Sequence, residues 1–260
     1  MPTLDRFAKP PVTDVELTAW FDPIRTIKSL HLAPLKIAWA SALPLVEENT
    51  PLAPWQPGAS FAFLEDGWPM PSCVFSSRSG ERNVLIQDDR FSLTWSFAKV
   101  LRYPGFAALR ADFASRFDEF IQASADAENH DPHIRQITVD YENLLEGFNS
   151  DEVAKSVLLD EQISCAAAEA VRPGSAGFRK EYDHDGTKIL LGIDPVSPDD
   201  YEGDAGENTP WATLLSVHAQ VGFEEGDWPA DRIRDAHAAA NRFFLSLFDD
   251  SLKAQWGCGL

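Results

Sequence analysis

Three charged residues, Asp88, Asp89 and Arg90, stand side by side in the stretch IQDDRFSLTW (86–95) and could form a catalytic group. Paired carboxylates act as general acid and base when their environments separate their pKa values, and an arginine can hold an anionic group. Adjacent strand residues point to opposite faces, so the two carboxylates would not share a site on a strand. Asp is common in turns, and we interpret Asp88 and Asp89 as a solvent-facing two-residue hairpin turn that leads into a core strand. Asn-Gly at these two positions would then preserve folding.

Other groups of histidine and acidic residues resemble metal sites but lack essential ligands. The motif HDPH (130–133) spaces two histidines around an acid in a Pro-containing loop, whereas zinc needs further ligands on a rigid frame. The motif DHDG (183–186) lacks the alternating oxygens and closing Glu of a calcium loop, and it predicts a hairpin turn. We therefore expect no metal and no cofactor.

The stretch SPDDYEGDAGENTP (197–210) has five acidic residues and no basic residue, which predicts a surface loop. Solvated charge is the usual role of such a loop, and weak cation binding is the alternative. The candidate cation ligands are Asp199, Asp200, Glu202 and Asp204.

The usual signatures of a catalytic nucleophile or a nucleotide site are missing from the sequence. It contains no G-x-S-x-G, no P-loop and no G-x-G-x-x-G. Cys165 lies in an apolar run and is predicted to be a core residue rather than a nucleophile. A non-enzymatic protein is therefore favoured, and a hydrolase with a dispersed Asp/Glu/His site is the alternative.

The hydrophobic pattern predicts the elements that position these residues. Alternating apolar residues predict strands, and spacings of three and four predict helices. The expected strands are 12–21, 60–66, 71–77, 83–87, 90–97, 134–145 and 212–223, with a hairpin at 177–196 that turns at 185–186. The expected helices are 33–43, 104–122, 150–161 and 231–248, and 48–58 is a Pro-rich connection.

Two parts of the sequence echo each other. A long alternating strand ending in Phe97 precedes Pro104 and a helix, and another ending in Phe223 precedes Pro229 and a helix. We interpret this as an internal duplication of a βββα-like unit in an α+β fold, with helices packed on one face of antiparallel sheet. The expected halves are 1–130 and 131–260, and a single compact domain with pseudo-repeats is the alternative.

The charge balance limits the classes of partner. The chain has 22 Lys and Arg against 41 Asp and Glu, a formal net charge of −19. Such a field repels nucleic acids and anionic membranes and attracts basic proteins. Three widely spaced cysteines predict reduced thiols, and no apolar stretch predicts a signal peptide or a membrane span. We therefore expect a cytoplasmic protein.

Three segments of the chain are distinctive: PPVTDVELTAWFDPI (10–24), the stretch from VLIQDDRFSLTWSF (84–97) to residue 120, and FFLSLFDDSLKAQWG (243–257). They resemble a sporadically distributed, uncharacterised bacterial protein family of about 250 residues. Where members show an arginine-tyrosine-asparagine run, this chain has VDYEN (139–143). The resemblance implies an accessory or defence-type role and no particular catalytic residues.

These observations predict an acidic cytoplasmic binding protein with a basic protein partner, such as a toxin, a nuclease or a phage protein. It would be antitoxin-, immunity- or phage-defence-associated. The alternatives are the hydrolase and a binder of a small apolar ligand, and a homodimer is left open. The polar sides of two strands are the predicted partner-binding positions: Ser92, Thr94, Ser96, Ser216, His218 and Gln220.

Overall fold

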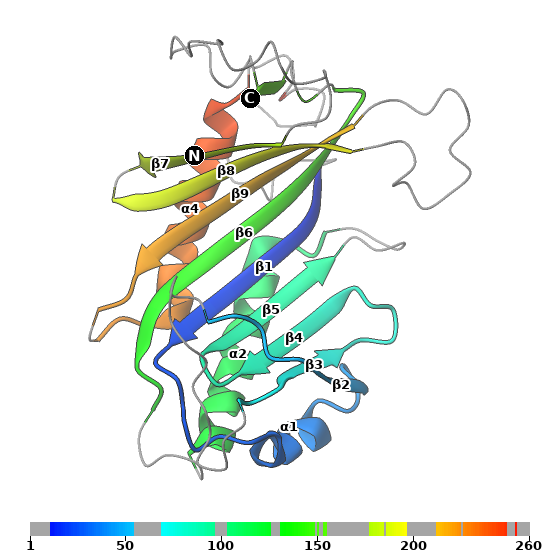
Figure 1. Ribbon diagram of the computed structural model, residues 1–260, viewed down its shortest axis with the longest axis vertical. Helices are drawn as coiled ribbons and strands as arrows, with labels where there is room; N and C mark the ends of the chain where they lie inside the picture. Colours follow the sequence, from blue (N-terminus) through cyan, green and yellow to red (C-terminus); the bar gives the residue numbers. More distant parts are fainter. Residues whose placement is uncertain are drawn as a thin grey trace. The chain divides into compact units, whose positions relative to one another are not determined.

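The computed structural model describes residues 11–54, 69–96, 103–125, 131–148, 150, 153–154, 177–184, 186–196, 212–224, 226–248 and 253. These residues form an α+β fold with a large antiparallel sheet (Figure 1). The strands are β1 (Val12–Phe21), β2 (Leu45–Asn49), β3 (Ser72–Ser76), β4 (Arg82–Gln87), β5 (Arg90–Ser96), β6 (Ile134–Glu146), β7 (Phe178–His184), β8 (Thr187–Val196) and β9 (Ala212–Gly222). The helices are the 3-10 helix η2 (Ser29–Leu32), α1 (Ala33–Ala38), α2 (Phe106–Ser124) and α4 (Pro229–Ser246).

The chain divides into two compact units whose segments are interleaved in sequence. The N-unit comprises Asp14–Val139 and Gln220–Ala236, and the C-unit comprises Met1–Thr13, Asp140–Ala219 and His237–Leu260. The expected halves, 1–130 and 131–260, divide the chain near the same point but do not include the exchanged segments. As a result β1, β6, β9 and α4 each contribute residues to both units.

In the N-unit, the strands hydrogen-bond in the order β2-β3-β4-β5-β1, and the first half of β6 follows β1. The antiparallel register of β1 and β5 places Leu17 opposite Leu93 and Ala19 opposite Phe91. Opposite residues share a side of the sheet, so this register collects the apolar side chains of both strands on one face.

Aromatic side chains of α2 cover that apolar face. The Phe91 ring of β5 lies 5.3 Å from the rings of Phe113 and Phe117 and 5.6 Å from that of Phe120, measured between centroids. All four side chains are buried. The apolar stripe predicted for residues 104–122 is therefore confirmed as the core-facing side of a helix.

In the C-unit, the strand order is β6-β9-β8-β7. The predicted hairpin is confirmed as β7 and β8, and Gly186 in its turn has a φ of +75°, a conformation that favours glycine. The ring of Phe243 on α4 lies 4.9 Å from the ring of Tyr182 on β7, measured between centroids. This contact packs the helix against β7, the last strand in the order.

Several elements differ from the sequence-based expectation. Strand β2 (Leu45–Asn49) was not predicted, because two adjacent glutamates and the following prolines resemble a connection. Helix α1 ends at Ala38, several residues before the predicted stop. The expected strand at 60–66 and most of the expected helix at 150–161 lie outside the described residues. Within the described ranges, no helix is long and apolar enough to cross a membrane.

Candidate functional site

Asp88 and Asp89 form the two-residue turn between β4 and β5, as predicted. The prediction that they face solvent is wrong, because Asp88, Asp89 and Arg90 are only 5%, 3% and 6% exposed. The last residue of β1 and the segment that follows it are hydrogen-bonded to this turn. The Asp89 carbonyl accepts the Phe21 N–H at 3.0 Å, and the Asp88 carbonyl accepts the Ile24 N–H at 2.8 Å.

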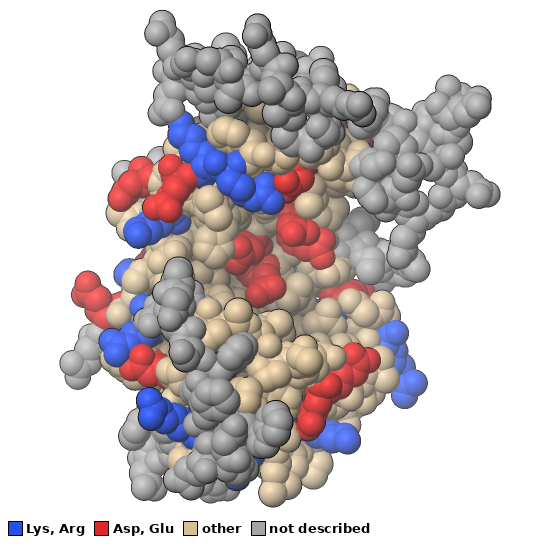
Figure 2. All heavy atoms as spheres, viewed as in Figure 1, with Lys and Arg blue, Asp and Glu red and all other residues tan. Residues whose placement is uncertain are grey.

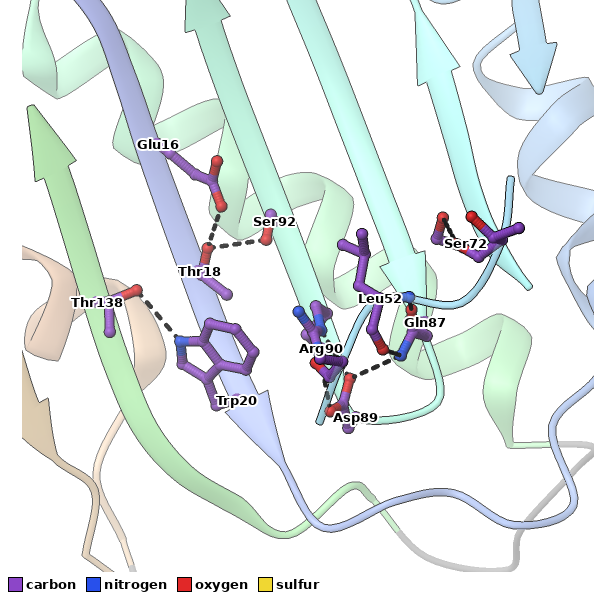
Figure 3. Close-up of polar contacts among 12 residues, drawn as sticks. Glu16, Thr18, Trp20, Leu52, Ser72, Gln87, Asp89, Arg90, Ser92 and Thr138 are labelled. Atoms are coloured by element: carbon purple, nitrogen blue, oxygen red, sulfur yellow. Dashed lines mark hydrogen bonds and ion pairs between the residues drawn. The ribbon is translucent and has the colours of Figure 1, made fainter. Parts of the chain in front are cut away.

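Arg90 is neutralised by a bidentate ion pair with Asp89 (Figure 3). Its Nε donates to Asp89 Oδ1 at 2.7 Å, and its Nη2 donates to Oδ2 at 3.0 Å. Nη2 also donates to the Ala53 carbonyl, and the guanidinium carbon lies 4.5 Å from the Trp20 ring centroid. The guanidinium is thus held by groups of the protein itself and is almost fully buried, which leaves little of it exposed to an anionic ligand.

The second carboxyl of the turn has an altered proton affinity. Burial raises the pKa of Asp88 to about 6, and the nearby charge of Asp89 contributes to the increase. Such a pKa would suit acid–base chemistry, but this buried side chain offers almost no surface to a substrate. The neighbouring Gln87 holds Leu52 through two hydrogen bonds, Leu52 N to Oε1 at 2.8 Å and Nε2 to Leu52 O at 3.1 Å. The turn is therefore a structural junction.

The opposite, polar face of β1 and β5 has a ladder of hydroxyls and carboxylates (Figure 3). Thr18 donates to Glu16 Oε1 at 2.9 Å, and Thr94 donates to Glu16 Oε2 at 3.4 Å. Thr18 has a single proton to donate, so Ser92, 2.8 Å away, donates to Thr18. A chain of hydroxyl groups thus directs its protons toward one carboxylate.

A second carboxylate extends this ladder. Ser96 donates to Asp14 Oδ1 at 2.5 Å. Asp14 and Glu16 are half-buried, whereas Thr18 and Ser92 are buried, so solvent reaches the carboxylates rather than the inner hydroxyls. Figure 2 shows acidic side chains over the strands in the same view. We call Asp14, Glu16, Thr18, Ser92, Thr94 and Ser96 the acidic ladder.

The polar face of the N-unit continues on β6 and on the end of β9. The Trp20 indole N–H donates to Thr138 Oγ1 at 3.2 Å. Gln220, one of the predicted partner-binding residues, donates through Nε2 to Gln136 Oε1 at 2.7 Å. These contacts fix polar side chains of neighbouring strands in one orientation each.

In the C-unit, His218 is hydrogen-bonded through Nδ1 to Asp140, and both side chains are about one-third exposed. A histidine and a carboxylate are two parts of a hydrolytic triad, which also needs an aligned nucleophile. Ser216 is two residues from His218 on β9, so their Cα atoms are separated by about 6.6 Å along the strand. Its hydroxyl lies over Gly192 of β8, and a triad of these three residues is not assembled.

Gly192 provides the space in which two side chains meet. A Cβ atom at this position would lie 2.3 Å from Ser216 Oγ and 2.8 Å from Arg179 Nη1. Arg179 also forms an ion pair with Asp194, 2.6 Å between Nη2 and Oδ2. The glycine thus lets the guanidinium and the hydroxyl lie directly on the backbone of β8.

The metal candidates form no centre in the described part of the chain. There, no group of three or more His, Cys, Asp or Glu side chains is arranged to hold a metal ion. His133 of the HDPH motif is hydrogen-bonded to Asp22 at 3.0 Å, and Arg135 forms a bidentate pair with the same carboxylate. The Arg135 hydrogen bonds lower the pKa of Asp22, against an opposing effect of burial. The cation candidates Asp199, Asp200, Glu202 and Asp204 lie outside the described residues.

Sequence reasoning missed the carboxylates that accompany the predicted hydroxyls. Asp14, Glu16 and Asp140 were visible only as polar positions of alternating strands. The missing information was strand pairing, since β1 and β5 are about seventy residues apart in sequence and β6 and β9 nearly as far.

Comparisons with known proteins give no family. No protein-family model matches the chain, and no curated protein matches it significantly in sequence. A duplicated taurocyamine kinase from Schistosoma mansoni aligns over 89% of this chain at 12% identity with a TM-score of 0.33, and the chain spans about one-third of that kinase (32%). The Mycobacterium tuberculosis type VII secretion chaperone EspG5, solved with a PE25–PPE41 dimer, aligns over 93% of this chain and 75% of its own at 10% identity with a TM-score of 0.18. Neither likeness is close enough to support a function.

Proposed function

We propose that the protein is a non-enzymatic cytoplasmic binding protein that uses the acidic ladder to hold a basic segment of a protein partner. The observation that carries the proposal is the hydrogen bonding of Asp14 and Glu16 by side chains of their own sheet. Carboxylates fixed in this way lose little conformational freedom when a cation binds, which favours affinity.

The charge around the ladder supports a cationic partner. Arg90 lies on the same side of β5 as the ladder, but Asp89 neutralises it. The net charge of −19 would attract a basic protein over distances up to about 10 Å at moderate salt. A bacterial toxin, nuclease or phage protein has this chemistry, and an antitoxin-, immunity- or phage-defence-associated role follows from it.

An internal duplication of a βββα-like unit would give the chain two related sheet faces. The element order supports it, because β3, β4 and β5 precede α2, and β7, β8 and β9 precede α4. The strand order supports it as well: β5 lies beside β1 in the order β3-β4-β5-β1, and β9 lies beside β6 in the order β7-β8-β9-β6. His218 and Asp140 would then be the second acidic position.

The test is affinity purification from the source organism at low salt with identification of the bound proteins. The face variant D14N/E16Q keeps the hydrogen-bond acceptors but removes two charges. The matched control E146Q/E224Q removes two charges from exposed glutamates outside the ladder. We expect the wild type and the control to recover one basic partner in stoichiometric amount and the face variant to lose it. Recovery of no stoichiometric partner, or equal recovery by all three proteins, would overturn the proposal.

A further inference from the structure

We infer that the outer edge of β2 is a strand-addition site for an extended segment that contains two consecutive basic residues. This edge is separate from the acidic ladder, so the inference goes beyond the proposed function and does not require it.

The β2 strand is bonded on one side only. It pairs with β3 from Leu45 opposite Ser76 to Asn49 opposite Ser72. The strand order begins at β2, so among the described residues no strand pairs with its other side. Four of its five residues are exposed. An edge strand of this kind presents N–H and C=O groups that can form a ladder with an incoming chain.

The side chains of β2 specify what the incoming chain should contain. Glu47 and Glu48 point to opposite sides of the sheet, because successive strand residues alternate. Their partners on β3 are Val74 and Cys73, which carry no positive charge. Both carboxylates are therefore open to cations on a chain that pairs with the other side.

The register then gives a pattern for the ligand. Opposite residues on paired strands share a side, so Glu47 and Glu48 call for two consecutive Lys or Arg residues. Leu45 and Val46 directly precede the two glutamates in β2, and Leu45 is 47% exposed. They call for two apolar residues beside the basic pair. The pattern is basic-basic-apolar-apolar in an antiparallel segment and its reverse in a parallel one.

A second copy of this chain fits the edge less well. In a two-fold pairing that uses all five residues of β2, Glu47 lies opposite Glu47 of the second copy. Like charges directly opposite each other destabilise a strand pair. The charge of the edge thus favours a basic segment of another protein over self-association.

The experiment uses two blocked ten-residue peptides with central Lys-Arg-Val-Ile or Ile-Val-Lys-Arg and isothermal titration calorimetry at low salt. We expect one of them to bind the wild-type protein. N-methylation of every second backbone nitrogen keeps all charges of the peptide but removes half of its N–H donors. Methylation of the nitrogens that face β2 should abolish binding, and methylation of those that face away from β2 should leave binding unchanged. Binding of neither peptide, or equal binding of both methylated forms, would overturn strand addition.

Protein variants separate this edge from the acidic ladder. E47Q/E48Q should weaken peptide binding roughly tenfold, because two opposite-charge pairs are lost. E146Q/E224Q removes the same charge from exposed glutamates outside both sites and should change peptide binding less than about twofold. A loss of peptide binding in D14N/E16Q with no effect of E47Q/E48Q would overturn the edge assignment. A dimer in analytical ultracentrifugation that the peptide dissociates would assign the edge to a second copy and equally overturn it.

Discussion

At the scale of single residues, the Asp88–Asp89–Arg90 turn shows which properties depend on local sequence. The turn itself was predictable because two polar residues separate two alternating apolar runs. Its burial was not, because the segments that bond to it, at Phe21–Ile24 and at Leu52–Ala53, come from distant parts of the chain. Asn-Gly at 88–89 is therefore no longer expected to be neutral, since it would leave Arg90 without its carboxylate.

The Asp89→Ala variant tests the buried ion pair. Removing one partner leaves a buried guanidinium uncompensated, so we expect a loss of about 3 kcal/mol in the free energy of unfolding. Urea denaturation measures it. The double variant D89A/R90M removes both charges and should be more stable than D89A. If the double variant were the less stable of the two, the ion pair would not be the reason for the loss.

Asp88 gives a prediction about pH. Its pKa is raised from 3.8 to about 6 in the folded protein, so the folded state binds the proton more tightly than the unfolded state. This stabilising effect is complete below about pH 4 and is lost as the pH rises through 6. D88N carries no such charge, so it should exceed the wild type by about 3 kcal/mol at pH 7.5 and by much less at pH 4.5. Urea titrations at both pH values measure the difference. The exposed control E146Q should show no such trend, and a constant difference for D88N would contradict the prediction.

At the scale of elements, periodicity was informative wherever one face is buried. The alternation in 90–97 and the stripe in 104–122 identified the β5 and α2 faces that meet at Phe91. Strand β2 has no buried stripe, because it is a short edge strand with mostly exposed side chains, and the same pattern analysis missed it. Edge strands are held mainly by backbone hydrogen bonds, and these do not require an alternating pattern of apolar residues in the sequence.

Phe91→Ala tests the contact between β5 and α2. Its side chain is fully buried against three phenylalanines, so we expect a loss of about 3–5 kcal/mol in the free energy of unfolding. Ile37→Ala on α1 is the control, because that side chain is 80% exposed and its loss should change stability by about 0.5 kcal/mol or less. Thermal and urea unfolding compare the two. Equal effects would contradict the assignment of Phe91 to the core.

At the scale of the whole molecule, composition and element types predicted an α+β chain in two parts, but not how the parts exchange segments. The N-unit includes residues 220–236 from late in the chain, and the C-unit includes the residues up to Thr13 from the start of the chain. Hydrogen bonds hold these segments within their units. In the N-unit the Phe223 N–H donates to the Arg135 carbonyl, and in the C-unit the Leu144 N–H donates to the Pro11 carbonyl. Long-range pairing of this kind has no signature in local periodicity.

The interleaving predicts that the chain cannot be cut at its sequence midpoint. Fragment 1–130 lacks β6 and residues 220–236, and fragment 131–260 lacks β1. We expect neither fragment alone to show a cooperative thermal transition, while co-expression should yield a folded complex of the two. Circular dichroism and size-exclusion chromatography measure this. A cooperative transition in either isolated fragment would show that the halves are independent.

The contact at Gly192 has a consequence for how related sequences can diverge. A side chain at position 192 would collide with the Arg179 guanidinium and with the Ser216 hydroxyl. A side chain at 192 therefore requires both the Arg179 guanidinium and the Ser216 hydroxyl to move or to be replaced, so we expect substitutions at 192 to accompany changes at 179 and 216. A lineage that loses Arg179 is partly released from the glycine. Co-variation of positions 179, 192 and 216 in an alignment of related sequences would confirm this expectation.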